Sequence, residues 1–186
     1  HYWPGIKGRG STAGFQETMS FQYEHFFREN RDNFQMSVLI GNRLCTHAGV
    51  GNDFLKSVGF WKMDSADESI ISDYLNDLFH YKPNEFTFDG SYDRNNTGVI
   101  PSYYGDDDWQ SPIWIRPRSL QRVNKKTDLK KNYIQIVGHT QQDHIDIKGK
   151  TTGGKYYYID TLPSGEYLID ADGEFEIGYA TIVKYT

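Results

Sequence analysis

This chain is organised around the stretch Arg43–Gly49, which reads RLCTHAG. Its apolar start predicts a short strand with His47 at the carboxyl end, and the Ala-Gly pair that follows leaves room beside the imidazole. A second stretch repeats the design, because the buried strand expected over residues 133–137 is followed by Gly138 and His139. Open sheets bind ligands beyond the carboxyl ends of their strands. We therefore expect His47 and His139 to converge on one site.

Length and composition describe one folded domain over residues 1–186. Hydrophobic residues make up 37% of the chain and charged residues 24%, which is typical of a folded protein rather than a disordered one. The net charge of −5 argues against general binding of nucleic acid. Cys45 is the sole cysteine, which favours a reducing, cytoplasmic location. We expect neither export nor membrane insertion, since no leader and no apolar run of spanning length is visible.

Two helices are expected from apolar residues at three- and four-residue spacing. The first runs from about Thr12 to Asn30, and we expect its apolar stripe to enter the core. That stripe consists of Phe15, Met19, Tyr23, Phe26 and Phe27. The second begins at Ser65, which forms a capping box with Glu68, and stops at Pro83. Its stripe consists of Ile70, Ile71, Tyr74, Leu75, Leu78 and Phe79. Residues 53–58 predict a further turn or two of helix.

Strands are indicated by β-branched and aromatic runs between turn residues. They are expected over residues 36–40, 43–46, 133–137, 155–161, 167–169 and 175–183. Gly41-Asn42 joins the first pair as a hairpin turn, and Asp172-Gly173 joins the last pair. The sequence therefore predicts an α/β protein that ends in antiparallel sheet, so that these residues taken alone have an α+β fold.

The region between the second helix and the second histidine strand is loop-rich and charged. Residues 84–112 predict a long loop, in which 106–108 are three aspartates without the alternating spacing of a helix-loop-helix calcium site. We interpret them as a solvated acidic turn. The basic run over 118–131 lacks interleaved aromatic residues, so we interpret it as a solvated connecting segment rather than a nucleic-acid interface. Arg116, next to ring-bearing neighbours, is a candidate phosphate clamp.

Four motifs occur in order along the chain: THAG at 46–49, WIRP at 114–117, VGHT at 137–140 and YIDT at 158–161. Together they resemble the carboxyl-terminal half of calcineurin-like metallophosphoesterases. The likeness is closest to the branch that contains bacterial and phage serine/threonine phosphatases and diadenosine tetraphosphatases, and it covers roughly residues 36–186. It implies a four-layer α/β/β/α sandwich, of which this chain supplies mainly the second sheet and its flanking helices.

The resemblance also implies a chemistry. In that family two divalent metal ions, which can be manganese, iron, zinc or nickel, share a bridging water that attacks the phosphorus of a phosphate ester. By this resemblance His47 and His139 bind one of the two ions, and Arg116 holds the substrate phosphate. The expected protein is a hydrolase of the serine/threonine phosphatase type, and its substrate is a phosphoprotein or a small phosphate ester.

This sequence departs from the family pattern in two ways. Gln141 stands where many broader members have a second histidine, which the phosphoprotein-phosphatase branch also lacks. The amino-terminal motifs Asp-x-His, Gly-Asp-x-x-Asp-Arg-Gly and Gly-Asn-His do not occur in these residues. Since those motifs supply most metal ligands, we expect this chain alone to be inactive, and to pair with an amino-terminal half or self-associate. The chain begins at His1 without a methionine, which suggests a processed or truncated product. We assign no role to His1.

Two other classes of function stay open at this point. A non-catalytic module would keep the family fold as a binding surface, because the absent motifs hold most catalytic groups. The other alternative is a phosphatase of nucleotides, of diadenosine polyphosphates or of nucleic-acid ends, the last suggested by the basic run alone. Neither the substrate nor the metal can be read from these residues.

Overall fold

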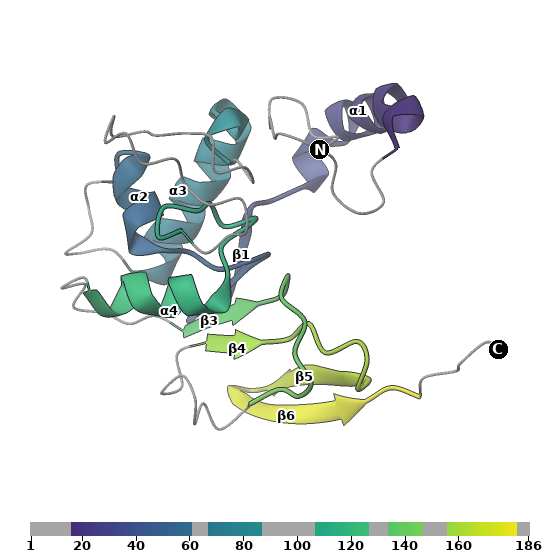
Figure 1. Ribbon diagram of the computed structural model, residues 1–186, viewed down its shortest axis with the longest axis vertical. Helices are drawn as coiled ribbons and strands as arrows, with labels where there is room; N and C mark the ends of the chain where they lie inside the picture. Colours follow the sequence, from purple (N-terminus) through teal and green to yellow (C-terminus); the bar gives the residue numbers. More distant parts are fainter. Residues whose placement is uncertain (1–15, 61–66, 87–106, 127–133, 147–155, 182–186) are drawn as a thin grey trace.

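The computed structural model describes residues 16–60, 67–86, 107–126, 134–146 and 156–181 (Figure 1). The α-helices are α1 Ser20–Glu29, α2 Asn52–Ser57, α3 Glu68–Tyr81 and α4 Pro117–Lys126. Short 3-10 helices are η1 Glu17–Met19, η2 Arg31–Asn33 and η3 Pro83–Glu85. The strands are β1 Ser37–Ile40, β2 Arg43–Thr46, β3 Ile134–Val137, β4 Tyr156–Tyr158, β5 Glu166–Ala171 and β6 Glu174–Tyr179. The protein is therefore a mixed α/β protein, as its sequence predicts.

Four strands form one mixed sheet in the order β1-β2-β3-β4, and β5 and β6 form a separate antiparallel pair. β1 and β2 are antiparallel and meet at a turn where Gly41 has a φ of 60°, a conformation that favours glycine. β2, β3 and β4 run parallel, so their carboxyl ends lie at the same edge of the sheet. The described strands overlap the predicted ranges, and both predicted hairpins are confirmed.

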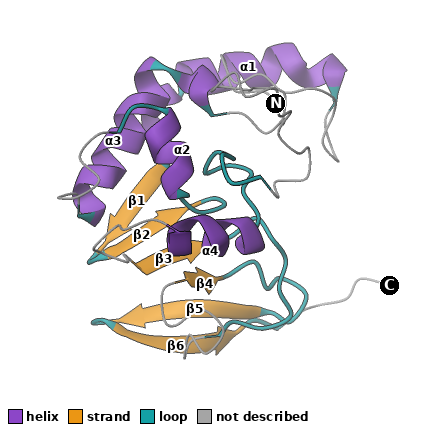
Figure 2. Ribbon diagram, turned by 60° about the vertical axis from the view of Figure 1, so that its left-hand side comes forward, coloured by secondary structure: helices purple, strands orange, loops and turns teal. Residues whose placement is uncertain are grey.

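Helices α2, α3 and α4 cover one face of this sheet (Figure 2). Under α2 and α3, the core includes the fully buried side chains of Phe54, Leu75 and Leu44, which come from α2, α3 and β2. Under α4, Leu120 belongs to a second cluster that includes Val137 of β3. Burying one such side chain stabilises the fold by about 2 kcal/mol. The two clusters hold β2 and β3 in place, and these are the strands that precede the two histidines.

The opposite face of the sheet is apolar and incompletely covered in the part of the chain that the structure describes. A hollow of about 460 Å³ lies on this face, and β1, β2 and β3 line it with Val38, Ile40, Cys45 and Ile136. Val38 and Ile40 are 46% and 47% exposed, although both are apolar strand residues. β1 is also an outer strand of the sheet. Apolar surface and a strand edge are therefore exposed together.

Helix α3 begins later than predicted. Its N-cap is Asp67, whose carboxylate accepts hydrogen bonds from the backbone N–H groups of Ser69 and Ile70. The predicted cap, Ser65, lies outside the described residues and is replaced in that role by Asp67, whose charge also suits a helix N-terminus. The apolar stripe is confirmed as core. Its buried members are Ile71, Leu75, Leu78 and Phe79.

The predicted burial of the first helix is wrong. No residue of α1 is buried, and Phe21, Tyr23 and Phe26 are 81%, 40% and 51% exposed. The helix extends away from the sheet in both views (Figures 1 and 2). Phe26 contacts the rings of Phe27 and Phe34 instead. The periodic spacing identifies a helix, but the core cluster that α2 and α3 form takes in Phe34, which follows α1, and no residue of α1 itself.

The segment after Arg116, which we predicted as a solvated connection, is helix α4. Its residues Leu120 and Val123 are completely buried, so this part of the prediction is wrong. Arg122 on the same helix donates through Nε to the Asp108 carboxylate at 2.7 Å. Asp108 is therefore paired rather than solvated. The many charges of this segment conceal a three-residue apolar spacing that is typical of a half-buried helix.

The β5-β6 hairpin is attached to the start of β2 by Arg43. Nη1 of Arg43 donates to Asp170 at 2.9 Å, and Nη2 donates to the backbone carbonyl of Gly173 at 2.7 Å. The guanidinium also lies 4.4 Å above the centre of the Phe175 ring. Phe175 packs edge-on against Tyr157 of β4, with 4.4 Å between the ring centres. One largely buried arginine thus ties the hairpin turn to the sheet.

Candidate functional site

His47 and His139 follow the adjacent parallel strands β2 and β3. The backbone carbonyl of His47 accepts a hydrogen bond of 3.0 Å from Gly138, which extends the strand pairing up to the two histidines. The ring centres lie 4.7 Å apart, and Nε2 of His47 lies 3.0 Å from Nδ1 of His139. The convergence of the two imidazoles that the sequence predicts is therefore observed, and metal binding by them stays a prediction.

His139 has a left-handed backbone conformation, with a φ of 66°. This region is uncommon for a residue with a side chain, and residues held in it concentrate at functional sites. In this conformation the imidazole contacts both His47 and the indole of Trp114, whose ring centre lies 5.2 Å away. Two ring contacts therefore set the orientation of the His139 side chain.

Both imidazoles favour their neutral form. Burial lowers the pKa of His47, and the negative charge of Asp160 opposes this shift. The pKa of His139 falls to about 4, first through burial and then through the neighbouring His47 and Arg116, while the Trp114 backbone opposes the shift. A hydrogen bond between the two facing nitrogens needs one imidazole as donor and the other as acceptor, and the tautomers decide which is which. Neutral imidazole is also the form that binds metal ions.

The pair of nitrogens fits one divalent ion. Bonds between zinc and imidazole measure about 2.0–2.1 Å, so two nitrogens 3.0 Å apart can reach the same ion. Among the described residues, however, no group of three or more His, Cys, Asp or Glu side chains is placed to hold a metal. Two neutral ligands leave the charge of the ion uncompensated. Tight binding therefore requires carboxylates beyond the two histidines.

Arg116 stands directly before α4 and reaches the loop that His139 begins. Its Nη1 donates to the hydroxyl of Thr140 at 3.2 Å, and its guanidinium carbon lies 5.4 Å from the ring centre of Trp114. Its positive charge also contributes to the low pKa of His139. The expected proximity of Arg116 to the histidines is therefore observed at His139. A planar guanidinium in this place is suited to bind two phosphoryl oxygens.

Leu120 of α4 occupies the space that the absent side chain of Gly49 leaves at the end of β2. Gly49 has a φ of 102°, and a Cβ atom at this position would overlap the side chain of Leu120. Ala48 is buried in the same cluster as Leu120, and its N–H donates to the carbonyl of Pro112 at 2.7 Å. The Ala-Gly pair therefore allows α4 to approach the end of β2. The pair thus has a packing role, and room for a ligand beside the exposed imidazole of His47 stays a prediction.

Sequence reasoning assigns no role to three further residues at this site. Trp114 and Thr140 contact Arg116, and Asp160 acts electrostatically on His47. Asp160 follows the apolar strand β4 just as the histidines follow β2 and β3, so its position was a usable signal. The contact of Thr140 with Arg116 joins residues 24 positions apart, which no local pattern indicates. His1 lies outside the described residues.

No family model matches this chain, and comparisons with curated proteins and with solved structures return no match either. None of the helices in the described ranges has the length and hydrophobicity of a transmembrane span. The likeness to metallophosphoesterases therefore rests on the four sequence motifs, and the function that it implies is a proposal.

Proposed function

We propose that this chain contributes two metal ligands and a phosphate-binding arginine to a metal-dependent phosphoesterase, a hydrolase of the calcineurin-like type. The observation that carries this proposal is the 3.0 Å separation between His47 Nε2 and His139 Nδ1, with Arg116 bonded to the residue after His139. The two histidines hold one divalent ion, which is manganese, iron, zinc or nickel, and the complete site holds two.

A divalent ion in such a site supplies a bound water of lowered pKa and positive charge for the phosphoryl oxygens. The residues of this chain provide the rest. Burial favours the neutral form of both imidazoles, and the tautomers that carry their protons on the outer nitrogens leave Nε2 of His47 and Nδ1 of His139 with lone pairs for an ion near pH 7. Thr140 and Trp114 hold the guanidinium of Arg116, which orients the ester and stabilises the charge that develops on its oxygens.

The carboxylate ligands, on this proposal, come from a sheet that packs on the open apolar face of β1, β2 and β3. The hollow on that face is lined by Val38, Ile40 and Cys45 and extends to His47, so an occupant of the face reaches the candidate site. Such a sheet completes a four-layer α/β/β/α sandwich. An amino-terminal half of the domain supplies it, and without that half a second copy of this chain covers the same apolar face without completing the metal site. The lone thiol of Cys45 suits a reducing, cytoplasmic setting.

A non-catalytic module on the same fold is the second candidate. It is favoured by one observation, namely that within the described ranges no third His, Cys, Asp or Glu side chain joins the two histidines to form a metal site. On this alternative the histidines and Arg116 bind a phosphorylated ligand without hydrolysing it. Phosphatases of diadenosine polyphosphates or of nucleic-acid ends differ from the leading proposal in substrate alone.

The test is a manganese-dependent phosphatase assay on the protein encoded by the whole reading frame. The substrates are a phosphopeptide, a diadenosine polyphosphate and a 5′-phosphorylated oligonucleotide. We expect His47→Ala to abolish turnover, and Arg116→Lys to lower it while metal content stays normal. Arg118→Lys is the matched control, since Arg118 is an exposed arginine two positions away. Unchanged kinetics in Arg116→Lys would remove Arg116 from the site, and metal binding without hydrolysis of any substrate would favour the non-catalytic module.

A further inference from the structure

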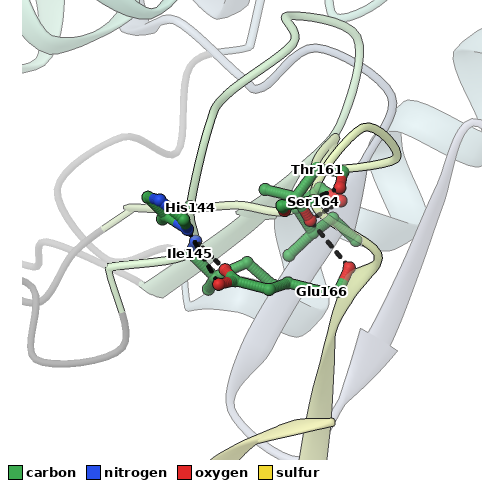
Figure 3. Close-up of polar contacts among 6 residues, drawn as sticks. His144, Ile145, Thr161, Ser164 and Glu166 are labelled. Carbon is green, nitrogen blue, oxygen red and sulfur yellow. Dashed lines mark hydrogen bonds and ion pairs between the residues drawn. The ribbon is translucent and has the colours of Figure 1, made fainter. Parts of the chain in front are cut away.

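Glu166, the first residue of β5, uses both carboxylate oxygens to hold the loop that follows His139 (Figure 3). Oε1 lies 2.8 Å from Nδ1 of His144, and Oε2 accepts a hydrogen bond of 2.8 Å from the backbone N–H of Ile145. The Glu166 side chain is only 7% exposed, whereas that of His144 is 76% exposed. One shielded carboxylate therefore holds both the main chain and a side chain of the loop.

The loop over residues 139–145 carries two groups of the candidate site. His139 begins the loop, and Thr140 accepts the hydrogen bond from Arg116. In the middle of the loop, the N–H of Gln142 donates to the backbone carbonyl of Asp160 at 2.8 Å. Glu166 adds an attachment at the far end. The strained backbone of His139 requires such attachments, because an uncommon conformation persists where surrounding contacts hold it.

Glu166 is itself held by the turn that precedes β5. The buried Thr161 donates through its hydroxyl to the backbone carbonyl of Glu166 at 2.8 Å. Ser164 donates in turn to the carbonyl of Thr161 at 3.0 Å (Figure 3). At the opposite end of β5, Asp170 accepts the hydrogen bond from Arg43. The hairpin is thus attached to the sheet at one end and to the site loop at the other.

We propose that Glu166 is a positioning residue, which keeps His139 and Thr140 in place beside His47 and Arg116 by holding the far end of their loop. The importance of this positioning for catalysis rests on the proposed function. The positioning itself can be measured in the metal-free chain. Glu166 touches neither histidine of the pair in the contacts described above. It acts through His144 and Ile145.

An ionised carboxylate suits this task. The hydrogen bond from Ile145 and then the contact with His144 lower the pKa of Glu166, while burial opposes the shift. Hydrogen bonds to a charged acceptor are roughly twice as strong as those between neutral groups. Truncating this side chain to the methyl group of alanine therefore releases both the side chain and the main chain of the loop.

Amide hydrogen exchange in the 186-residue chain tests this role. In Glu166→Ala we expect the amide hydrogens of Thr140 and Gln142 to exchange about tenfold faster, since the loop then opens locally. The affinity for Ni²⁺, measured by titration, should fall about fivefold because the imidazole pair is less well ordered. Glu166→Gln should restore most of the protection, because its amide oxygen can accept from Ile145 and its amide nitrogen can donate to His144.

Asp170→Asn is the matched control, because it weakens the attachment at the other end of the same strand. It should lower the resistance to denaturant and leave exchange at Thr140 and Gln142 unchanged. The proposal is overturned if Glu166→Ala leaves these two amides protected, or if both variants accelerate their exchange equally. Absence of Ni²⁺ binding to the unchanged chain would count against the two histidines as metal ligands, whereas the exchange rates alone decide the role of Glu166.

Discussion

The Nε2 atom of His47 and the Nδ1 atom of His139 lie 3.0 Å apart, although 92 positions separate the two residues in the chain. We predict that this pair binds one Mn²⁺ or Ni²⁺ ion weakly, since two neutral ligands do not compensate the charge of a dication. The chain alone should not hydrolyse a chromogenic phosphate ester. Metal analysis after dialysis, together with an assay in added manganese, measures both expectations.

The fluorescence of Trp114 can report metal binding by the two histidines, because its ring centre lies 5.2 Å from that of His139. A paramagnetic ion at the imidazole pair should quench the fluorescence of Trp114. His47→Ala should remove the quenching, and Trp114→Phe is the control for its source. Two tightly held ions per chain, or turnover that His47→Ala abolishes, would show that other residues complete the site.

Because His139 has a left-handed backbone, we predict that a substitution at this position can abolish metal binding with little change in the free energy of unfolding. His139→Gly removes conformational strain of roughly 1 kcal/mol or more and also removes the ring contacts with His47 and Trp114. We therefore expect its free energy of unfolding to change by less than about 1 kcal/mol, while metal binding is lost. His139→Val, which is β-branched, should be less stable than His139→Gly by about 2 kcal/mol. Equal stability of these two variants in urea would contradict the strain.

Gly49 combines a φ of 102° with a Cβ direction that Leu120 occupies. Gly49→Ala should lower the free energy of unfolding by about 2 kcal/mol or more, because both the backbone and α4 must shift. Gly138→Ala is the control. A Cβ atom there meets the backbone oxygen of His47 at an ordinary 3.5 Å, so the expected change is within about 1 kcal/mol. Similar losses in the two variants would mean that Leu120 does not limit the approach of α4.

Arg43→Lys should destabilise the protein by about 2 kcal/mol. A single ammonium group cannot reproduce the hydrogen bonds to Asp170 and Gly173 together with the contact over the Phe175 ring. The control is Arg28→Lys, which alters an exposed ion pair on α1 and should change stability by less than about 0.5 kcal/mol. Denaturant unfolding compares the two. An equal effect of both substitutions would count against the attachment of the hairpin through Arg43.

We predict that Glu166 contributes to the free energy of unfolding at neutral pH and that this contribution is lost in acid. Its pKa in the folded protein lies below the ordinary 4.5. As the pH falls, the unfolded chain therefore binds a proton at this residue before the folded chain does. Glu166 stabilises the fold above about pH 4.5, and this contribution is lost as the pH falls through the folded-state pKa. Unfolding free energies measured across this range should depend less on pH in Glu166→Gln, and parallel curves for the two proteins would contradict the prediction.

The sequence by itself determined the local elements and the place of the two histidines. Gly41 and Gly173, which adopt φ values of 60° and 99°, located both hairpins because few other residues tolerate these conformations. The apolar period located α3 and its buried face. His47 and His139 were predictable as neighbours because parallel strands bring their carboxyl ends to one edge of a sheet.

Only the tertiary structure decided what each element packs against. The apolar residues of α1 repeat at helical spacing like those of α3, yet α1 is exposed and α3 is buried. Leu120 fills the space at Gly49, and Glu166 holds His144, across 71 and 22 positions of the chain. A short window of sequence reports which face of an element is apolar. The free energy that selects a partner for that face comes from contacts between distant residues, and these exist once the chain has folded.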